Sequence, residues 1–326
     1  MPGGIPGGIP GGIPGGIPGG IPGGIPGGIE VRIGTNPIAW SNDDLPELGG
    51  ETPLETCLAE AHQAGFTGIE KGNKFPSDPD ALKAVLARHD LALVSGWYGA
   101  ALRTRSVEAE IVAMRPHFEL LRALGSSVMV FAETSGTVQG QRDVPVAERP
   151  RMSEAEWPVF LDRLAALGEW MADRGVRIAF HPHMGTVIEN GDEVDRLLAG
   201  TPPAVGLLLD TGHLEFAGED PARAAERWAR RVNHVHAKDV RREVLARARG
   251  ERMSFLDAVV AGVFTVPGDG MLDFAAALAP VAKAGYSGWL IVEAEQDPAK
   301  APPLRYARNG YAHLRRAAEQ VGFRIG

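Results

Sequence analysis

Eight short apolar segments alternate with amphipathic helical segments along the chain, and this alternation limits the fold more than any other feature. The apolar segments are rich in Val, Ile and Leu, as expected for buried strands, and the helices between them favour parallel pairing. Eight strand–helix units in a chain of this length suit a closed barrel better than an open sheet. We therefore predict an α/β fold, a single (βα)8 TIM barrel over residues 30–326.

The predicted elements follow from the hydrophobic periodicity and from the glycines that end several helices. Strands are expected at residues 31–34, 68–70, 91–95, 127–132, 176–181, 204–210, 232–236 and 288–293. Helices are expected at residues 53–64, 80–89, 107–124, 154–174, 192–198, 221–230, 274–284 and 304–321. Residues 241–264 form a long insertion after the seventh strand, on the face where such loops usually shape the site.

Residues 2–29 consist of seven copies of Pro-Gly-Gly-Ile. The repeat has no charge, no helical period and no alternation, and glycine is costly to order while proline lacks a backbone donor. We predict that residues 1–29 are a low-complexity arm outside the fold, and it lacks the basic start and continuous apolar stretch of a signal peptide.

Composition excludes several classes of protein. The net charge of −8 disfavours nucleic-acid phosphates, and no apolar run reaches the length of a membrane helix. The only cysteine, Cys57, lies in a predicted helix, where a buried thiol is expected rather than a nucleophile, and one cysteine allows no intrachain disulfide. We expect a cytoplasmic protein with a small-molecule substrate, no nucleic-acid or membrane partner, and homo-oligomerisation left open.

Acidic and imidazole side chains, together with one lysine, follow the predicted strands where each strand ends. In a barrel of this kind these ends meet at one rim, which carries the active site. The residues are Glu70, Glu133, His181, His183, Asp210, His213, His234, His236, Lys238, Glu293 and Glu295. Their convergence is the main functional signal in the sequence.

Three of these residues fit metal ligands best. Asp210 follows a fully apolar strand, although it could instead cap a helix that begins at Thr211. His236 shares one face of its strand with His234 and Lys238, and is the stronger ligand candidate of the two histidines. Glu293 ends another buried strand, with Glu295 as a possible replacement.

The remaining rim residues have open roles. His181 and His183 flank a proline and face the same way, so either one fits a metal ligand or a proton-transfer group. Glu133 fits a ligand, an acid–base group or a structural ion pair. Beside a cation we expect the pKa of Lys238 to fall, which suits proton transfer. This mixed oxygen and nitrogen set favours Mn2+, Co2+, Fe2+ or Zn2+ over Ca2+.

Several longer strings resemble the inosose dehydratases of myo-inositol catabolism, within the xylose-isomerase-like barrels. The resemblance covers nearly all of residues 30–326, and only the HxKD element is common to the whole superfamily. The strings are TNPIAWSNDDLP (35–46), LGGETPLET (48–56), GNKFP (72–76), SGWY (95–98), HPHMG (181–185), DTGH (210–213), HVHAKD (234–239), SFLDA (254–258), FTVPGDG (264–270) and VEAEQD (292–297).

The resemblance implies a hydro-lyase that converts 2-keto-myo-inositol (scyllo-inosose), a cyclic polyol ketone, to a trihydroxycyclohexane-dione through an enediolate and loss of water. It also implies a Mn2+ or Co2+ requirement and metal ligands at His181, Asp210, His236 and Glu293. His181 stands where related sugar epimerases have Glu. Lys71 and Pro182 also depart from the dehydratase pattern.

For catalysis we expect His183 or Glu133 as base, Lys238 as acid or stabiliser, and Glu70 in either role. Substrate-binding candidates are Asn36, Trp40, Asn73, Lys74, Trp97 and His213, although core packing explains the tryptophans equally well. The alternative function is a sugar or inosose epimerase or isomerase with the same metal chemistry. An abasic-site endonuclease and a non-catalytic carbohydrate-binding barrel fit less well.

Overall fold

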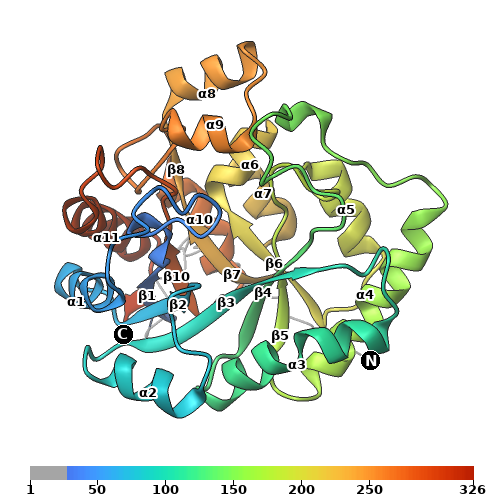
Figure 1. Ribbon diagram of the computed structural model, residues 1–326, viewed down its shortest axis with the longest axis horizontal. Helices are drawn as coiled ribbons and strands as arrows, with labels where there is room; N and C mark the ends of the chain where they lie inside the picture. Colours follow the sequence, from blue (N-terminus) through green and yellow to red (C-terminus); the bar gives the residue numbers. More distant parts are fainter. Residues whose placement is uncertain (1–27) are drawn as a thin grey trace, which may run out of the picture.

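The computed structural model describes residues 28–326, in which eight parallel strands close into a barrel. The strands follow one another in chain order, and β10 pairs with β1 to complete the ring, as Figure 1 shows from one end. They are β1 (Glu30–Thr35), β2 (Gly68–Lys71), β3 (Ala92–Ala100), β4 (Val128–Glu133), β5 (Arg177–Phe180), β6 (Val205–Asp210), β7 (Val232–Ala237) and β10 (Trp289–Val292). The predicted (βα)8 barrel is confirmed; the predicted arm lies outside the described residues except for positions 28 and 29.

Helices connect the strands and cover the outside of the barrel (Figure 1). They are α1 (Leu54–Ala64), α2 (Pro79–Ala87), α3 (Val107–Ala123), α4 (Glu156–Ala172), α5 (Gly191–Ala199), α6 (Thr211–Ala217), α7 (Pro221–Trp228), α10 (Phe274–Lys283) and α11 (Pro303–Gln320). Two 3-10 turns, η1 (Pro37–Ala39) and η2 (Val146–Glu148), lie in the connections. Gly65 ends α1 with a φ of 107°, the left-handed conformation that favours glycine at this position.

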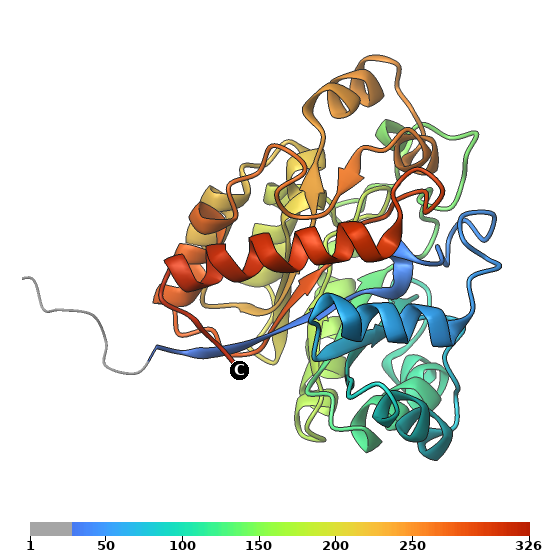
Figure 2. The same cartoon turned by 90° about the vertical axis from the view of Figure 1, so that its left-hand side faces the viewer.

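The insertion after β7 is folded. It contains β8 (Asp239–Val240), α8 (Arg242–Gly250), α9 (Phe255–Val260) and β9 (Phe264–Thr265). Leu245, Phe255 and Phe264 belong to a separate apolar cluster beneath it. Figures 1 and 2 show α8 and α9 standing apart from the ring of helices. The insertion therefore has a core of its own and forms a wall beside one end of the barrel.

A short strand, β11 (Arg324–Ile325), pairs in parallel with the beginning of β1. Glu30 lies opposite Arg324, and Val31 lies opposite Ile325. The last described residues are thus fixed beside the first barrel strand, at the end where β1 starts, and Figure 2 shows this from the side.

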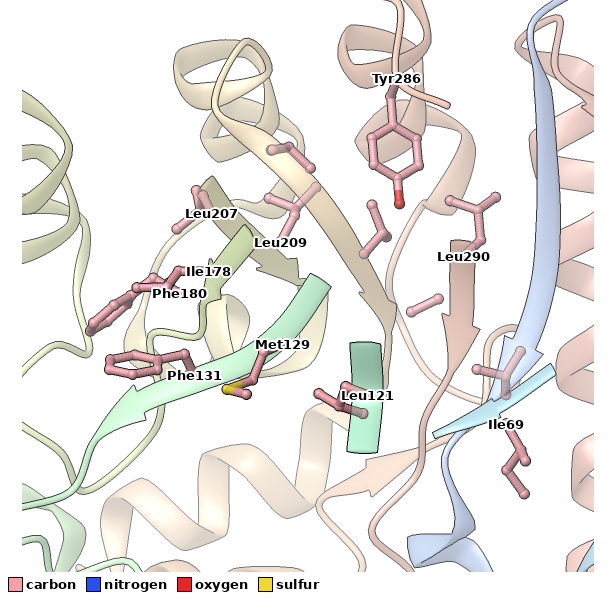
Figure 3. Close-up of a cluster of buried hydrophobic side chains, with 14 of the residues drawn as sticks. Ile69, Leu121, Met129, Phe131, Ile178, Phe180, Leu207, Leu209, Tyr286 and Leu290 are labelled. Atoms are coloured by element: carbon pink, nitrogen blue, oxygen red, sulfur yellow. The ribbon is translucent and has the colours of Figure 1, made fainter. Parts of the chain in front are cut away.

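Apolar side chains form two layers on the two faces of the strands. Figure 3 shows the outer layer, in which Phe131 of β4 and Phe180 of β5 pack with ring centroids 6.0 Å apart, under the helices. The inner layer includes Val130, Ala179 and Leu208. Because successive residues of a strand point to opposite faces, these inner residues fix which later residues of each strand point into the barrel.

Two expectations from the sequence concern single features of the chain. Cys57 is buried in α1, as predicted, and burial raises the pKa of its thiol. Among residues 28–326, no helix combines the length and apolarity needed to cross a membrane.

Candidate metal centre

Asp210, His236 and Glu293 meet at the rim of the barrel because each lies on the inner face of its strand. Asp210 follows inner Leu208 by two residues, and it lies directly opposite His236 in the pairing of β6 with β7. Glu293 follows β10, two residues after Ile291, which is the partner of His236 on that side. One oxygen or nitrogen from each of the three residues lies within 4.8 Å of the others, in the arrangement of a metal-ligand group.

Three buried polar atoms of this group have no hydrogen-bond partner among the described residues. They are Asp210 Oδ2, His236 Nδ1 and Glu293 Oε2. They face one another: Nδ1 of His236 is 3.6 Å from Asp210 Oδ2 and in ion-pair contact with Glu293 Oε2. Buried polar atoms are rarely left unpaired, since this costs free energy, so the three atoms have the properties expected of ligands to a cation.

The other oxygen of Asp210 has a separate task. Asp210 Oδ1 accepts hydrogen bonds from the backbone amides of Gly212 (2.8 Å) and His213 (2.9 Å), and so caps the start of α6. The alternative explanation of Asp210 as a helix cap is therefore correct for this oxygen, and it leaves Oδ2 free to face His236.

Glu70 crosses the barrel from β2 and contacts both histidines of β7. Its carboxylate lies 2.8 Å from Nε2 of His234 and 3.2 Å from Nε2 of His236, and it accepts a hydrogen bond of 2.8 Å from the Asn36 side chain. Burial acts to raise the pKa of Glu70, but His236 and His234 together outweigh burial and hold this pKa below its usual range. For His236 burial acts downward, yet Glu293 and Glu70 raise its pKa well above the usual value.

His181 and His183 differ in their surroundings. Nε2 of His181 lies 3.6 Å from Asp210 Oδ2, and its Nδ1 lies 2.8 Å from the carbonyl oxygen of Pro182. Burial lowers the pKa of His181 to about 3, so the ring is neutral and its Nε2 carries a lone pair. His183 instead packs against His213, with ring centroids 4.0 Å apart and ring planes tilted by 39°, and burial lowers the pKa of His183 too.

Lys238 is fully buried behind the rim carboxylates. Its Nζ lies 2.6 Å from Glu295 Oε1, 3.0 Å from Glu293 Oε1 and 3.7 Å from Asp210 Oδ2. The protein's own groups therefore move its pKa in the direction opposite to our expectation. Burial acts to lower the pKa, but Glu293 and the other carboxylates raise it above the usual value, so Lys238 is a fixed positive charge.

A cavity of about 330 Å³ opens above these residues. Trp97, which is 38% exposed, forms part of the cavity wall and makes T-shaped ring contacts with His181 and His183, at centroid distances of 5.7 and 5.4 Å. The predicted site residues that line the cavity are Asn36, Glu70, Asn73, Trp97, His181, His183, His236 and Glu293. The structure thus brings together most of the candidates on one polar surface.

Other predicted site residues do not line this cavity. Trp40 is buried in the core and donates from Nε1 to Glu60. Nζ of Lys74 donates to backbone carbonyls of the loop at residues 49–52. His213 lies outside the cavity lining, and its Nδ1 accepts a hydrogen bond from the backbone amide of Met184.

Glu133 also lies away from the metal-ligand group. Its carboxylate accepts from the backbone amides of Ser135 (2.9 Å) and Arg103 (3.4 Å). The alternation along β4 explains this position, because Val130 points inward and Glu133, three residues later, points to the other face. Burial raises the pKa of Glu133 despite these hydrogen bonds.

The sequence did not single out several residues that line the cavity, among them Asp43, Asp44 and Lys71. Asp43 and Asp44 lie in the loop after η1, where no periodic pattern indicates which side chains turn inward. Both remain accessible to solvent, but burial of the carboxyl group and the nearby Glu295 raise the pKa of Asp44 to about 6. Of these three residues, only Lys71 could have been noticed in the sequence, because it departs from the dehydratase pattern.

Comparisons with known proteins find relatives that match most of this chain. The family described as "Xylose isomerase-like TIM barrel" matches residues 58–317. The chain is 51% identical over 296 residues to the rhizopine catabolism protein MocC of Rhizobium meliloti, covering 90% of this chain and 91% of the relative. It is 45% identical over 288 residues to the inosose dehydratase of Geobacillus thermodenitrificans, covering 88% and 97%.

Solved structures share the fold. One is described as the IOLI protein with a binding zinc atom; it superimposes with a TM-score of 0.62 at 16% identity and covers 89% of this chain and 98% of its own. At this identity the likeness supports the barrel fold alone.

Proposed function

Because the chain belongs to the xylose isomerase-like TIM-barrel family and, within it, to the inosose dehydratases, we propose that it is a metal-dependent hydro-lyase that removes water from 2-keto-myo-inositol. The observation that carries this proposal is a trio of buried atoms without hydrogen bonds, Asp210 Oδ2, His236 Nδ1 and Glu293 Oε2, which face one another beside a polar cavity. The product would be a trihydroxycyclohexane-dione, as part of inositol catabolism in the cytoplasm.

Asp210, His236 and Glu293 would hold the metal, with His181 as fourth ligand. His181 is preferred to His183 because its Nε2 lies 3.6 Å from Asp210 Oδ2. Two carboxylates and two imidazoles suit Mn2+ or Co2+. When bound, such an ion supplies Lewis-acid stabilisation of negative charge on a ketone oxygen.

Glu70 would position His236. A hydrogen bond from Nε2–H of His236 to Glu70 leaves the Nδ1 lone pair directed at Asp210 and Glu293. Carboxylates in this place commonly fix the tautomer of a ligand histidine and increase its basicity. We therefore assign Glu70 a positioning role in place of the acid or base role considered from the sequence.

Loss of water requires a base for the proton next to the ketone and an acid for the departing hydroxyl. His183 lines the cavity, and burial keeps its ring neutral, so it fits the base. Glu133, the other candidate, faces backbone amides instead. Lys238 does not reach the cavity surface, so we assign it the neutralisation of Glu293 and Glu295.

The cavity suits a polyhydroxylated ring. Asn36, Asn73 and Asp44 supply hydrogen-bonding groups along its lining, while Trp97 offers an apolar wall. Sites of this kind usually combine a few polar groups, which orient the ligand, with an aromatic surface.

The test is a reaction of the chelator-treated full chain with scyllo-inosose, with and without Mn2+ or Co2+, followed by mass spectrometry of the products. Metal-dependent loss of one water supports the proposal. A product of unchanged mass would favour the epimerase or isomerase alternative, and no reaction with either metal would contradict both. A relative at 51% identity is named for rhizopine catabolism, so other cyclic polyol ketones belong in the same assay.

A further inference from the structure

The ammonium group of Lys238 lies between two groups of potential metal ligands. The first is the trio of Asp210, His236 and Glu293 described above. The second consists of His183, His213 and Glu295, all buried, each with a donor atom within 4.8 Å of the other two. Nζ of Lys238 is 3.1 Å from His213 Nε2 and 2.6 Å from Glu295 Oε1, so the ammonium contacts two of the three members of the second group.

Lys238 also touches the first group. Its Nζ lies 3.0 Å from Glu293 Oε1 and 3.7 Å from Asp210 Oδ2. In two-metal centres, carboxylates commonly lie between neighbouring ions. The ammonium of Lys238 contacts carboxylates of both groups, so its positive charge stands where the second ion of such a centre would be.

The surrounding residues are fitted to the lysine. The hydroxyl of Thr211 accepts from the backbone amide of Lys238 (3.0 Å) and lies 2.7 Å from its carbonyl oxygen. A Cβ at Gly212 would lie 2.6 Å from Cγ of Lys238, so glycine leaves the space that the lysine stem fills. The ring of Phe264 lies 4.7 Å from Nζ, within range of a cation–π contact.

We propose that Lys238 occupies a latent second metal site, formed by His183, His213 and Glu295, and thereby limits the centre to one divalent cation. This inference rests on the proposed metal centre. A divalent ion in the second group would meet the ammonium at contact distance in a buried site, where repulsion between like charges is poorly screened. With the lysine removed, the two imidazoles and the carboxylate can bind a second ion. His213 then binds through Nε2 in the tautomer that carries its proton on Nδ1, which gives up the hydrogen bond from the Met184 amide.

The experiment measures bound Mn2+ per chain in the metal-loaded full-length protein by mass spectrometry, together with electron paramagnetic resonance. We expect about one ion per chain in the unchanged protein and about two in Lys238→Ala, because the ammonium no longer contacts His213 and Glu295 and the second group of ligands can accept an ion. Two neighbouring Mn2+ ions would also give an exchange-coupled spectrum, which a single isolated ion does not show.

Two matched variants separate charge from side-chain removal. Lys238→Arg keeps the cation and should stay at about one ion. Lys238→Ala/His213→Ala removes a ligand of the second group and should return to about one ion. Lys238→Ser, which leaves a polar space of similar size, replaces Lys238→Ala if that variant does not fold.

The outcomes are distinguishable. About one ion in folded Lys238→Ala or Lys238→Ser overturns the latent site and leaves the proposed function intact. A second ion bound by the unchanged protein also overturns it, because Lys238 then does not limit the centre. No bound ion in the unchanged protein contradicts the proposed metal centre itself.

Discussion

Nε2 of His236 lies 3.2 Å from the Glu70 carboxylate, so a residue of β2 fixes the ring of a candidate ligand on β7. The two strands are not neighbours in the barrel, and the contact crosses its interior. Because the other ring nitrogen faces Asp210 and Glu293, this one hydrogen bond decides which nitrogen is available for a metal ion.

Glu70→Gln should weaken metal binding by roughly 10–100-fold, the usual effect of changing a group that supports a ligand histidine. Glutamine keeps an acceptor for His236 but removes the negative charge that raises the pKa and basicity of the imidazole. Calorimetric titration of the metal-free protein with Mn2+ measures the change.

The control for this variant is Glu55→Gln. Glu55 is an exposed carboxylate on α1 that pairs with Arg88 and His89. The Mn2+ affinity of Glu55→Gln should match that of the unchanged protein. An equal loss of Mn2+ affinity in Glu55→Gln and Glu70→Gln would contradict the positioning role of Glu70.

Asp210→Asn and Asp210→Ala should separate the two tasks of Asp210. Both variants lose the charged ligand atom and should lose bound metal and turnover. Only Asp210→Ala also removes the acceptor that caps α6, which lowers the free energy of unfolding by about 1 kcal/mol more than Asp210→Asn does. Metal content and thermal unfolding of the metal-free proteins test this, and full metal content in Asp210→Asn would rule out the ligand assignment.

Trp97→Ala should raise KM roughly 2- to 12-fold with little change in kcat, because an aromatic contact contributes about 0.5–1.5 kcal/mol. Trp97 forms part of the cavity wall. The comparison is Trp40→Phe, a core change that loses the hydrogen bond to Glu60 and should lower the melting temperature but leave KM unchanged. A change in KM for Trp40→Phe alone would reverse these assignments.

Asp44→Asn should become more stabilising as the pH rises through about 6. Burial and nearby carboxylates raise the pKa of Asp44 from 3.8 to about 6, so the folded protein binds this proton more tightly than the unfolded chain. The stability that the proton provides is complete below pH 3.8 and is lost as the pH rises through about 6.

Asparagine carries no such charge, so the difference in melting temperature between variant and unchanged protein should grow over that pH range. Solvent access to Asp44 keeps the difference small. Thermal scans of the metal-free proteins at several pH values measure it, and a constant difference would show that Asp44 does not titrate there.

The alternation of apolar strands and helices made the barrel predictable. Part of the site was predictable too, because every second residue of a strand points into the barrel. Asp210, His236 and Glu293 each follow inward-pointing residues at a spacing of two. The same rule, applied to β4, places Glu133 on the opposite face from Val130, so its distance from the ligand group could also have been read from the sequence.

Other features depend on contacts between distant segments, which a local pattern does not contain. Trp40 is turned into the core by packing and by its bond to Glu60, and Lys74 is engaged by carbonyls of a loop. The placement of Asp44 at the cavity depends on how the loop after η1 folds back. Helix α6 is only seven residues long, too short for a clear period.

The pairing of β11 with the beginning of β1 has a practical consequence for handling the protein. Both ends of the described chain leave from the side of the barrel where β1 begins, whereas the ligand group follows the ends of β6, β7 and β10. A tag, a fused partner or a solid support attached at the C-terminus would therefore leave the cavity open to substrate. The same nearness of the two ends makes this barrel a good scaffold for circular permutation, with new termini placed in exposed loops elsewhere.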